Sequence, residues 1–204
     1  MRYYFSPPTC SLAGMLALEA TGAEYEPIAV DLRGERSELR AVSPVGKVPA
    51  LATGGSVLTE TVAIITWLAR RFPEARLLPE EVDASAQAVS VMTWLTSTVH
   101  ILRRQFMVPM AFGVGAEAQA ELSRVAEPRY WAELKRIDHL IDDGHMTPAG
   151  VQRYALLFYH WGMIDSFPVG NLKHFTSLAR RLVELPDVRL ALERHYSPLL
   201  HAWA

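Results

Sequence analysis

The sequence predicts an α/β N-terminal domain followed by an all-helical C-terminal domain. Over residues 1–72, short apolar and aromatic runs that favour strands alternate with segments whose apolar residues recur at helical spacing. Residues 73–83 contain two prolines and several charged residues, which is typical of a linker. From residue 84 to residue 204 the apolar pattern is helical throughout.

The order of elements in residues 1–72 indicates a particular α/β arrangement. Strands are predicted over 2–5, 25–32, 48–52 and 56–58, and helices over 11–21 and 61–71. Thr53-Gly54-Gly55 is a hairpin signal between the last two strands. Residues 33–42 have few apolar anchors and favour a short exposed helix or a loop. A βαβ unit followed by a ββα unit predicts a thioredoxin-like domain.

Residues 84–204 are predicted to form a bundle of helices. These helices are predicted over 84–106, 116–141, 147–164, 174–185 and 187–195. Pro128 lies inside the second of them and removes a backbone hydrogen bond there, so we expect a kink or a break. The third helix is apolar on nearly every side, which predicts a central position in the bundle.

Composition indicates which binding partners and which cellular compartment to expect. Half of the 204 residues are hydrophobic, the formal net charge is −2, and no basic stripe is present, which argues against nucleic acid. The single cysteine excludes an internal disulfide and is consistent with a reducing compartment. We expect neither a signal peptide nor a membrane-spanning segment, and therefore a cytoplasmic protein. The seven histidines show no paired ligand spacing, so no metal site is predicted.

Residues 43–51, SPVGKVPAL, form the first candidate binding segment. The dipeptide Val48-Pro49 stands just before a predicted strand, where a proline needs a specific reason. An X-Pro bond adopts the cis form at a far lower cost than other peptide bonds. A cis bond here would turn the backbone N–H and C=O of Val48 outward, toward a ligand. The alternative is an ordinary trans proline at a strand edge.

The start of the following helix is the second candidate binding segment. Glu60 and Thr61 open this helix, whose first N–H groups have no partner within the helix. Together with the helix dipole, these N–H groups favour an anion such as a carboxylate. Thr59 or Thr61 can add a hydroxyl, and Glu60 can accept a hydrogen bond from an ammonium group. The alternative is N-capping by Thr59, which is compatible with ligand binding.

Cys10 and Ser11 are the candidates for sulfur chemistry. Cys10 follows a strand and a proline-containing turn, at the first turn of a helix, and this position lowers the pKa of a thiol. Its thiolate could form a mixed disulfide with a bound thiol, whereas a lone cysteine can also be a small buried apolar residue. The hydroxyl of Ser11 or Ser6 could stabilise a bound thiolate. Ser11 could equally cap the helix.

Three segments, taken in order, resemble the glutathione S-transferases. They are residues 4–13, YFSPPTCSLA, residues 46–51, GKVPAL, and residues 58–64, LTETVAI. The first segment resembles the bacterial beta-type branch in particular. The resemblance is close over residues 1–72 and continuous, though looser, to the end of the chain. It implies a homodimer whose first domain binds glutathione. The residues implied to contact glutathione are Lys47, Val48, Pro49, Glu60 and Thr61.

The resemblance also implies roles beside the glutathione sulfur. Beta-type transferases carry a cysteine at the position of Cys10, which contacts the sulfur and can bond to it. The segment Ser97-Thr98-Val99-His100 resembles a segment of these relatives whose histidine faces the sulfur. From the residues alone, His100 is more typical of an exposed or core histidine, and Arg103-Arg104 of a solvated helix face. The candidate catalytic residues are Cys10, Ser11 and His100.

The chain departs from the family pattern at two places. Thr147-Pro148-Ala149-Gly150 stands where the family has a capping box that ends in an acidic residue, so the reciprocal side-chain bond cannot form. Residues 33–42 are a shorter segment than usual, without the lysine that binds the glycine end of glutathione. Arg33 or Arg36 could replace that lysine.

Together these patterns predict a glutathione S-transferase-like enzyme without a metal. Glutathione is its expected substrate, and a small hydrophobic electrophile or a disulfide is its expected co-substrate. One alternative is a glutathione-dependent thiol–disulfide reductase or peroxidase that uses Cys10 covalently. The other is a non-catalytic binding scaffold, which the altered capping box favours.

Overall fold

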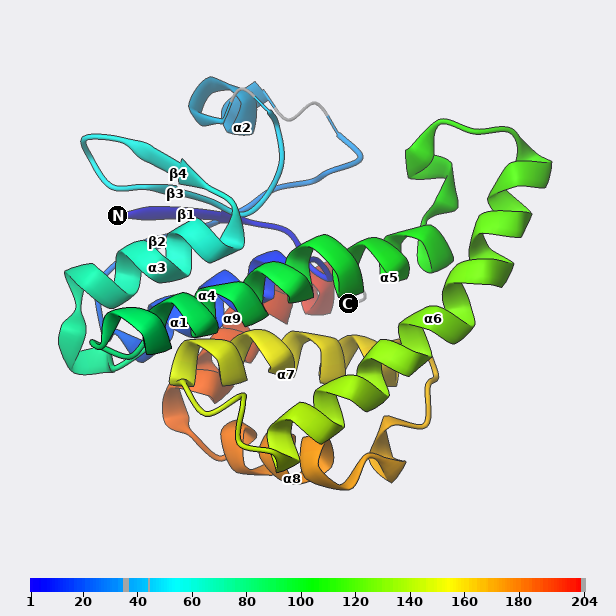
Figure 1. Cartoon of the computed structure of the whole chain (residues 1–204). Coiled ribbons are helices and arrows are strands. Elements are labelled where there is room, and N and C mark those ends of the chain that lie inside the picture. Colours follow the sequence, from blue (N-terminus) through cyan, green and yellow to red (C-terminus); the bar gives the residue numbers. More distant parts are fainter. Residues whose placement is uncertain (35–36, 44, 203–204) are drawn as a thin grey trace.

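The computed structural model of the chain describes residues 1–34, 37–43 and 45–202. A sheet with three helices comes first, and a set of longer helices follows (Figure 1). The strands are β1 (Arg2–Phe5), β2 (Glu26–Ala29), β3 (Ala50–Ala52) and β4 (Val57–Thr59). The helices around them are α1 (Ser11–Ala20), α2 (Ser37–Val42) and α3 (Thr61–Arg71).

The sheet has the strand order β2-β1-β3-β4. Strand β1 pairs with β2 in parallel and with β3 antiparallel, and β3 pairs antiparallel with β4. The predicted βαβ and ββα units are therefore confirmed. Pro27 lies in β2, which is an edge strand and tolerates a residue without an N–H. Strand β3 begins only after Pro49 and is shorter than predicted, because that residue has no N–H to pair.

The two faces of the sheet pack against different partners. Tyr3 and Phe5 of β1 point into the main core, whereas Tyr4 between them packs with Leu39 of α2 and with Val48 in a small second core. This alternation is the period of two that a strand imposes on its side chains. The segment that carries Val48 is thus anchored to the sheet from the α2 side.

The second half of the chain is helical, as predicted. Its helices are α4 (Val82–Trp94), α5 (His100–Met107), α6 (Ala116–Asp142), α7 (Ala149–Ile164), α8 (Lys173–Val183) and α9 (Pro186–Ala202). A π-helical turn, Leu95–Val99, joins α4 to α5 in one long rod (Figure 1). Short 3₁₀ segments span Pro73–Ala75, Pro109–Phe112 and Val169–Asn171. Helix α7 is buried along most of its length, which confirms its predicted central position. Helix α6 runs through Pro128 without interruption, so the expected break is absent.

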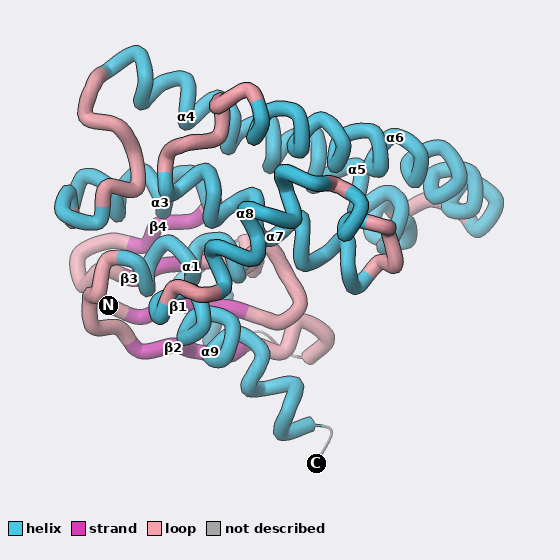
Figure 2. Tube along the Cα trace, turned by 90° about the horizontal axis from the view of Figure 1, so that it is seen from below, coloured by secondary structure: helices cyan, strands magenta, loops and turns pink. Residues whose placement is uncertain are grey.

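Helix α1 lies between the sheet and the later helices, where α7 and α9 pack against it (Figure 1). Every residue from Ser11 to Leu18 is buried, so this helix is covered on all sides over most of its length. Figure 2 shows α9 beside α1 and β2, with its C-terminal end extending beyond them. Helix α9 is also longer than the predicted 187–195, because it continues through Pro198 to Ala202.

The N-terminus of α7 explains why a glycine stands in the altered capping box. The Gly150 N–H donates a 2.8 Å hydrogen bond to the carbonyl oxygen of Leu77, in the segment between α3 and α4. A Cβ atom on Gly150 would lie 2.8 Å from that same oxygen and 3.1 Å from Ile65 Cγ2. The departure from the family pattern therefore accompanies a close approach of two backbones.

Within the described residues, no helix is both long and apolar enough to cross a bilayer.

Candidate functional site

A cleft lies where the end of the sheet meets the rod of α4 and α5. Two adjoining cavities, of about 200 and about 400 Å³, form this cleft. The residues that line both cavities are Cys10, Lys47, Val48, His100 and Arg104. The predicted residues that line only the smaller cavity are Pro49, Glu60 and Thr61. The structure thus brings together every predicted site residue except Ser11.

The Val48-Pro49 bond is cis, as the first candidate segment predicts, and the trans alternative is wrong. Val48 is almost fully buried, and its carbonyl oxygen accepts a hydrogen bond from the Cys10 thiol across 3.7 Å. Lys47 is exposed at the rim of the cleft. The backbone of Val48 therefore forms part of the wall beside Cys10.

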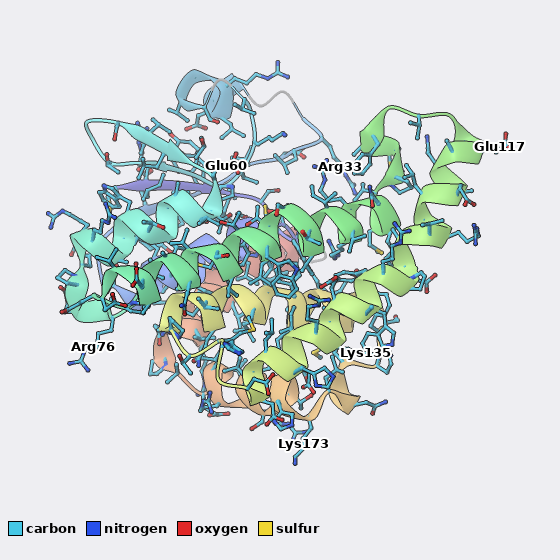
Figure 3. The ribbon with its side chains drawn as sticks, viewed as in Figure 1. Arg33, Glu60, Arg76, Glu117, Lys135 and Lys173 are labelled. Carbon is cyan, nitrogen blue, oxygen red and sulfur yellow. The ribbon has the colours of Figure 1, made fainter. Side chains whose placement is uncertain are left out.

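The start of α3 forms the opposite wall of the smaller cavity. Glu60 has φ 66° and ψ 120°, a left-handed conformation that is uncommon for a residue other than glycine. Within the described part of the chain, no side chain caps this helix, so the alternative of N-capping by Thr59 is not observed. Figure 3 shows Glu60 at this end of α3. An uncapped helix start that borders a cavity can receive an anionic group.

Cys10 is half-buried at the N-terminus of α1, and its thiol is less acidic than predicted. Burial, with a smaller effect from the charge of Glu60, raises the pKa of the Cys10 thiol to about 11. A backbone hydrogen bond and the charges of Arg104 and Arg103 act in the opposite direction and are outweighed. The predicted lowering of the pKa is therefore wrong, because removal of water disfavours the thiolate.

Ser11 lies behind the cleft rather than in it. Its side chain is fully buried, and its hydroxyl accepts a hydrogen bond from the Ser6 N–H across 3.2 Å. The same hydroxyl lies 2.7 Å from Thr9 Oγ1 and 3.0 Å from Nε2 of His195 in α9. Ser6 is also buried. Neither serine lines the cleft, so the structure does not support the predicted contact with a bound sulfur.

His100 lines both cavities, as the resemblance implies. Burial, with smaller effects from Arg104 and Arg103, lowers the pKa of His100 to about 4. Its ring packs against the ring of Trp161, with 5.1 Å between the two ring centroids. A neutral imidazole thus faces the cleft at pH 7.

The π-helical turn before His100 brings a second polar residue to the same cavity. Thr96 lines the smaller cavity and donates a 3.0 Å hydrogen bond to the Met92 carbonyl oxygen. Tyr154 of α7 lies 2.6 Å from Thr96 Oγ1, and because the Thr96 proton is already used, the Tyr154 hydroxyl is the donor. Sequence reasoning missed both residues. Such π-helical turns are frequent at functional sites, yet no local pattern marked this one.

The two neighbouring arginines have different roles. Arg103 forms a buried ion pair with Asp165, with 2.6 and 2.8 Å between nitrogen and oxygen atoms, and its guanidinium lies 4.1 Å from the Trp161 ring centroid. Arg104 lines both cavities. Arg104 therefore supplies positive potential to the cleft, whereas the charge of Arg103 is balanced by Asp165.

The expected partner for the glycine end of glutathione is only partly located. Arg33 is exposed on the loop after β2 (Figure 3), while its neighbour Leu32 lines the larger cavity. Arg36 lies outside the described residues.

Among the residues that the structure describes, no group of histidine, cysteine or acidic side chains could hold a metal ion.

Comparison with known proteins agrees with this geometry. Residues 3–76 match the family model of the glutathione S-transferase N-terminal domain. Glutathione S-transferase GstA of Escherichia coli O157:H7 is 29% identical in an alignment of 203 positions that covers 94% of this chain and 97% of that protein. Residues 3–76 thus form a glutathione S-transferase N-terminal domain, and the chain as a whole is similar to a glutathione S-transferase.

Two solved structures extend the likeness to the whole fold. A sphingomonad glutathione S-transferase complexed with glutathione has a TM-score of 0.81 and 26% identity, over 96% of this chain and 98% of that one. A bacterial beta-class glutathione S-transferase of Sphingomonas chungbukensis has a TM-score of 0.80 and 26% identity over the same shares. The predicted thioredoxin-like domain and helical domain are thus confirmed, and their arrangement matches that of solved glutathione S-transferase structures.

Proposed function

We propose that the cleft binds glutathione and that the chain conjugates it through its sulfur to a small hydrophobic electrophile, with release of the thiol proton and, from an aryl halide, of the halide. The observation that carries this proposal is the convergence of three groups on one cavity: the backbone of Val48, the uncapped start of α3, and Cys10. A structurally similar sphingomonad transferase is complexed with the same tripeptide. The proposal includes a homodimer in the cytoplasm, and residues 73–83 as the boundary between the binding domain and the helical domain.

The binding domain offers a complementary group for each part of a γ-glutamyl tripeptide. The Val48 backbone can pair with the extended main chain of the peptide, as a strand edge does. The free N–H groups at the start of α3, with the Thr61 hydroxyl, can receive the γ-glutamyl carboxylate. Glu60 can accept from the ammonium group, and Lys47 at the rim can pair with the other carboxylate. The peptide sulfur then lies near Cys10.

Groups from both domains complete the site around the sulfur. Arg104 and the N-terminus of α1 place positive potential where a thiolate would form, which favours ionisation of the bound thiol. Lowering its pKa from near 9 toward 7 raises the reactive fraction at pH 7 by roughly 10- to 100-fold. The larger cavity adds apolar walls from Leu32, Val108 and Trp161, which suit a hydrophobic co-substrate. Holding both reactants in one cleft supplies proximity.

The state of Cys10 favours conjugation over the reductase or peroxidase alternative. An enzyme that attacks with its own cysteine needs the thiolate, and burial raises the pKa of the Cys10 thiol to about 11. The scaffold alternative drew its support from the altered capping box. Because Gly150 is engaged in a close backbone contact, that feature no longer favours a loss of catalysis.

Calorimetry with glutathione and turnover of an aryl halide test this proposal together. We expect the wild type to bind and to turn over, and Thr61→Val to bind glutathione about tenfold more weakly because one hydrogen bond to a charged group is lost. Thr93→Val is the matched control, since the Thr93 hydroxyl is exposed and bonds only to Val89 of its own helix. Absence of both heat and turnover in the wild type would overturn the proposal.

A further inference from the structure

A buried histidine from the far end of the chain contacts the turn that carries Cys10. His195 of α9 is fully buried, and its Nε2 lies 3.0 Å from the Ser11 hydroxyl oxygen. Its other ring nitrogen, Nδ1, has no hydrogen-bond partner among the described residues. The ring also packs against Phe5 of β1, with 5.5 Å between centroids. The bond to Ser11 is therefore the one polar contact of this ring that the structure describes.

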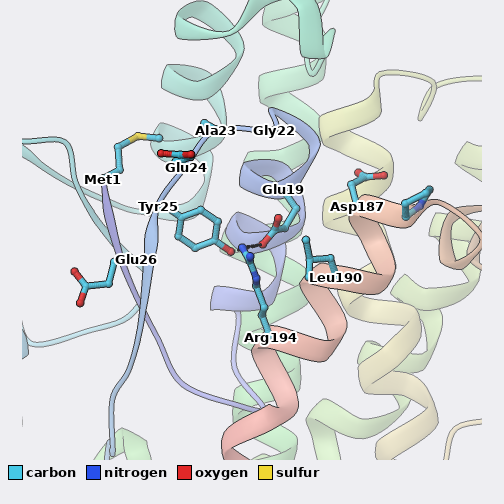
Figure 4. A pocket seen from close by; sticks show the side chains of 11 residues that line it. Met1, Glu19, Gly22, Ala23, Glu24, Tyr25, Glu26, Asp187, Leu190 and Arg194 are labelled. Atoms are coloured by element: carbon cyan, nitrogen blue, oxygen red, sulfur yellow. Dashed lines mark hydrogen bonds and ion pairs between the residues drawn. The ribbon is translucent and has the colours of Figure 1, made fainter.

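Helix α9 is held on α1 beside this contact. Arg194, the residue before His195, pairs with Glu19 of α1 across 2.7 Å, and the Tyr25 hydroxyl donates to the same carboxylate across 2.5 Å. Figure 4 shows these three side chains converging from α9, α1 and the start of β2, at the edge of a separate cavity of about 830 Å³. These contacts between α9, α1 and Tyr25 hold His195 in position and do not involve the turn that carries Cys10.

Burying the polar ring of His195 costs free energy, which its hydrogen bond to Ser11 can offset. A buried polar ring with one unpaired nitrogen is less favourable than an apolar side chain of similar size. Burial, with a smaller effect from His160, lowers the pKa of His195 to about 3, so the imidazole stays neutral in the physiological range. What His195 adds over a leucine is the hydrogen bond.

The Ser11 hydroxyl is the centre of the turn formed by residues 6–11. It accepts from the Ser6 N–H, approaches the Ser6 carbonyl oxygen at 3.3 Å and meets Thr9 Oγ1 at 2.7 Å. Thr9 in turn donates to the Ser6 carbonyl oxygen at 2.6 Å. Cys10 lies between the two hydroxyl residues of this network. A partner that fixes the Ser11 hydroxyl therefore also fixes the backbone of Cys10.

We propose that His195 is a positioning residue that locks the 6–11 turn through Ser11 and thereby holds the Cys10 thiol against the Val48 carbonyl. Its value for catalysis rests on the proposed function, because the glutathione sulfur is proposed to lie beside Cys10. The hold on Cys10 itself is independent of glutathione and can be measured without it.

Alkylation of the full-length protein by iodoacetamide tests the proposal directly. Cys10 is the only cysteine, so the reaction reports this thiol alone. Without glutathione at pH 8, we expect His195→Leu to be alkylated at least about tenfold faster than the wild type, because a released thiol is more accessible and regains a lower pKa. His195→Gln should restore a slow rate, since its amide nitrogen can donate to Ser11. Ser11→Ala should match His195→Leu, and the double variant should add nothing further.

Tyr196→Phe is the matched control for loss of packing in α9. The Tyr196 hydroxyl is buried beside His195 and has no partner among the described residues, so its removal leaves the Ser11 bond intact. Equal rates in His195→Leu and wild type, acceleration in Tyr196→Phe, or failure of His195→Gln to slow the reaction would each overturn the inference. If His195→Leu does not fold, Ser11→Ala against Tyr196→Phe decides. Lack of glutathione binding by the wild type would overturn the proposed function and leave the alkylation result standing.

Discussion

The Cys10 thiol donates a hydrogen bond to the main-chain carbonyl of Val48, across 3.7 Å and between segments 38 residues apart in sequence. The cysteine thus occupies the backbone group that an extended peptide would use. A bound tripeptide whose N–H takes this carbonyl would release the thiol, with its sulfur and the Cys10 sulfur as neighbours. The weak thiol bond is readily exchanged for an amide bond.

Cys10→Ala is expected to bind glutathione at least as tightly as the wild type, because no thiol then competes for the Val48 carbonyl. Conjugation of an aryl halide should stay within about tenfold of the wild-type kcat/KM, since Cys10 is protonated near neutral pH and is not the attacking sulfur. Any glutathione-dependent disulfide reduction should disappear. Steady-state kinetics with both substrate types checks this. Loss of both activities in a folded variant would assign Cys10 a direct role in conjugation.

Acid is expected to destabilise the protein through two buried histidines. Burial lowers the pKa of His100 to about 4 and that of His195 to about 3, whereas both titrate near 6.5 in an unfolded chain. Between about pH 6.5 and 4 the unfolded state therefore binds more protons, and stability falls as the pH is lowered. Each histidine contributes a slope of up to about 1.4 kcal/mol per pH unit in this window.

Urea unfolding at several pH values from about 7.5 to 4.5 measures this slope. His100→Gln cannot take up a proton, so it should lose less stability on acidification than the wild type does. If the two proteins show the same dependence on pH, the neutral buried state of His100 is refuted.

Local patterns predicted the parts of the site that depend on local geometry. Residues adjacent in sequence marked Val48-Pro49 as either a cis bond or an ordinary trans proline and Glu60 as a helix start, and the cis bond and the helix start are observed. Positions that depend on distant packing were not predictable in this way. The burial of Ser11 and the high pKa of Cys10 arise because α9 and the helical rod cover the N-terminus of α1. Tyr154 likewise reaches the cleft from a helix whose pattern indicates only a core.

Asp165→Asn is expected to destabilise the fold by about 3 kcal/mol or more. Its carboxylate is fully buried and receives both bonds from Arg103, so the change leaves a buried guanidinium without its counter-charge. Glu121→Gln is the matched control, because that residue pairs with Arg124 through two similar bonds in an exposed setting. The control should change stability by less than about 1 kcal/mol. Equal effects of the two substitutions on the urea midpoint would contradict the role given to burial.

Gly150→Ala tests whether the altered capping box reflects packing. In an ordinary helix this change would stabilise the protein by up to about 1 kcal/mol. Here the new Cβ would lie 2.8 Å from the Leu77 carbonyl oxygen, an atom that the Gly150 N–H already bonds, so neither backbone can move away without breaking that bond. We expect a net loss of about 1–3 kcal/mol, as for other overpacked sites.

Gly150→Asp, which restores an acidic residue at the end of the box, carries the same Cβ and should also lose stability. If capping were the limiting feature, the aspartate would instead raise the free energy of unfolding. Gly170→Ala serves as the control, because a Cβ there meets no heavy atom within 4 Å. Urea denaturation of the three variants separates the two explanations, since packing at Leu77 predicts losses for alanine and aspartate at position 150 and little change at position 170.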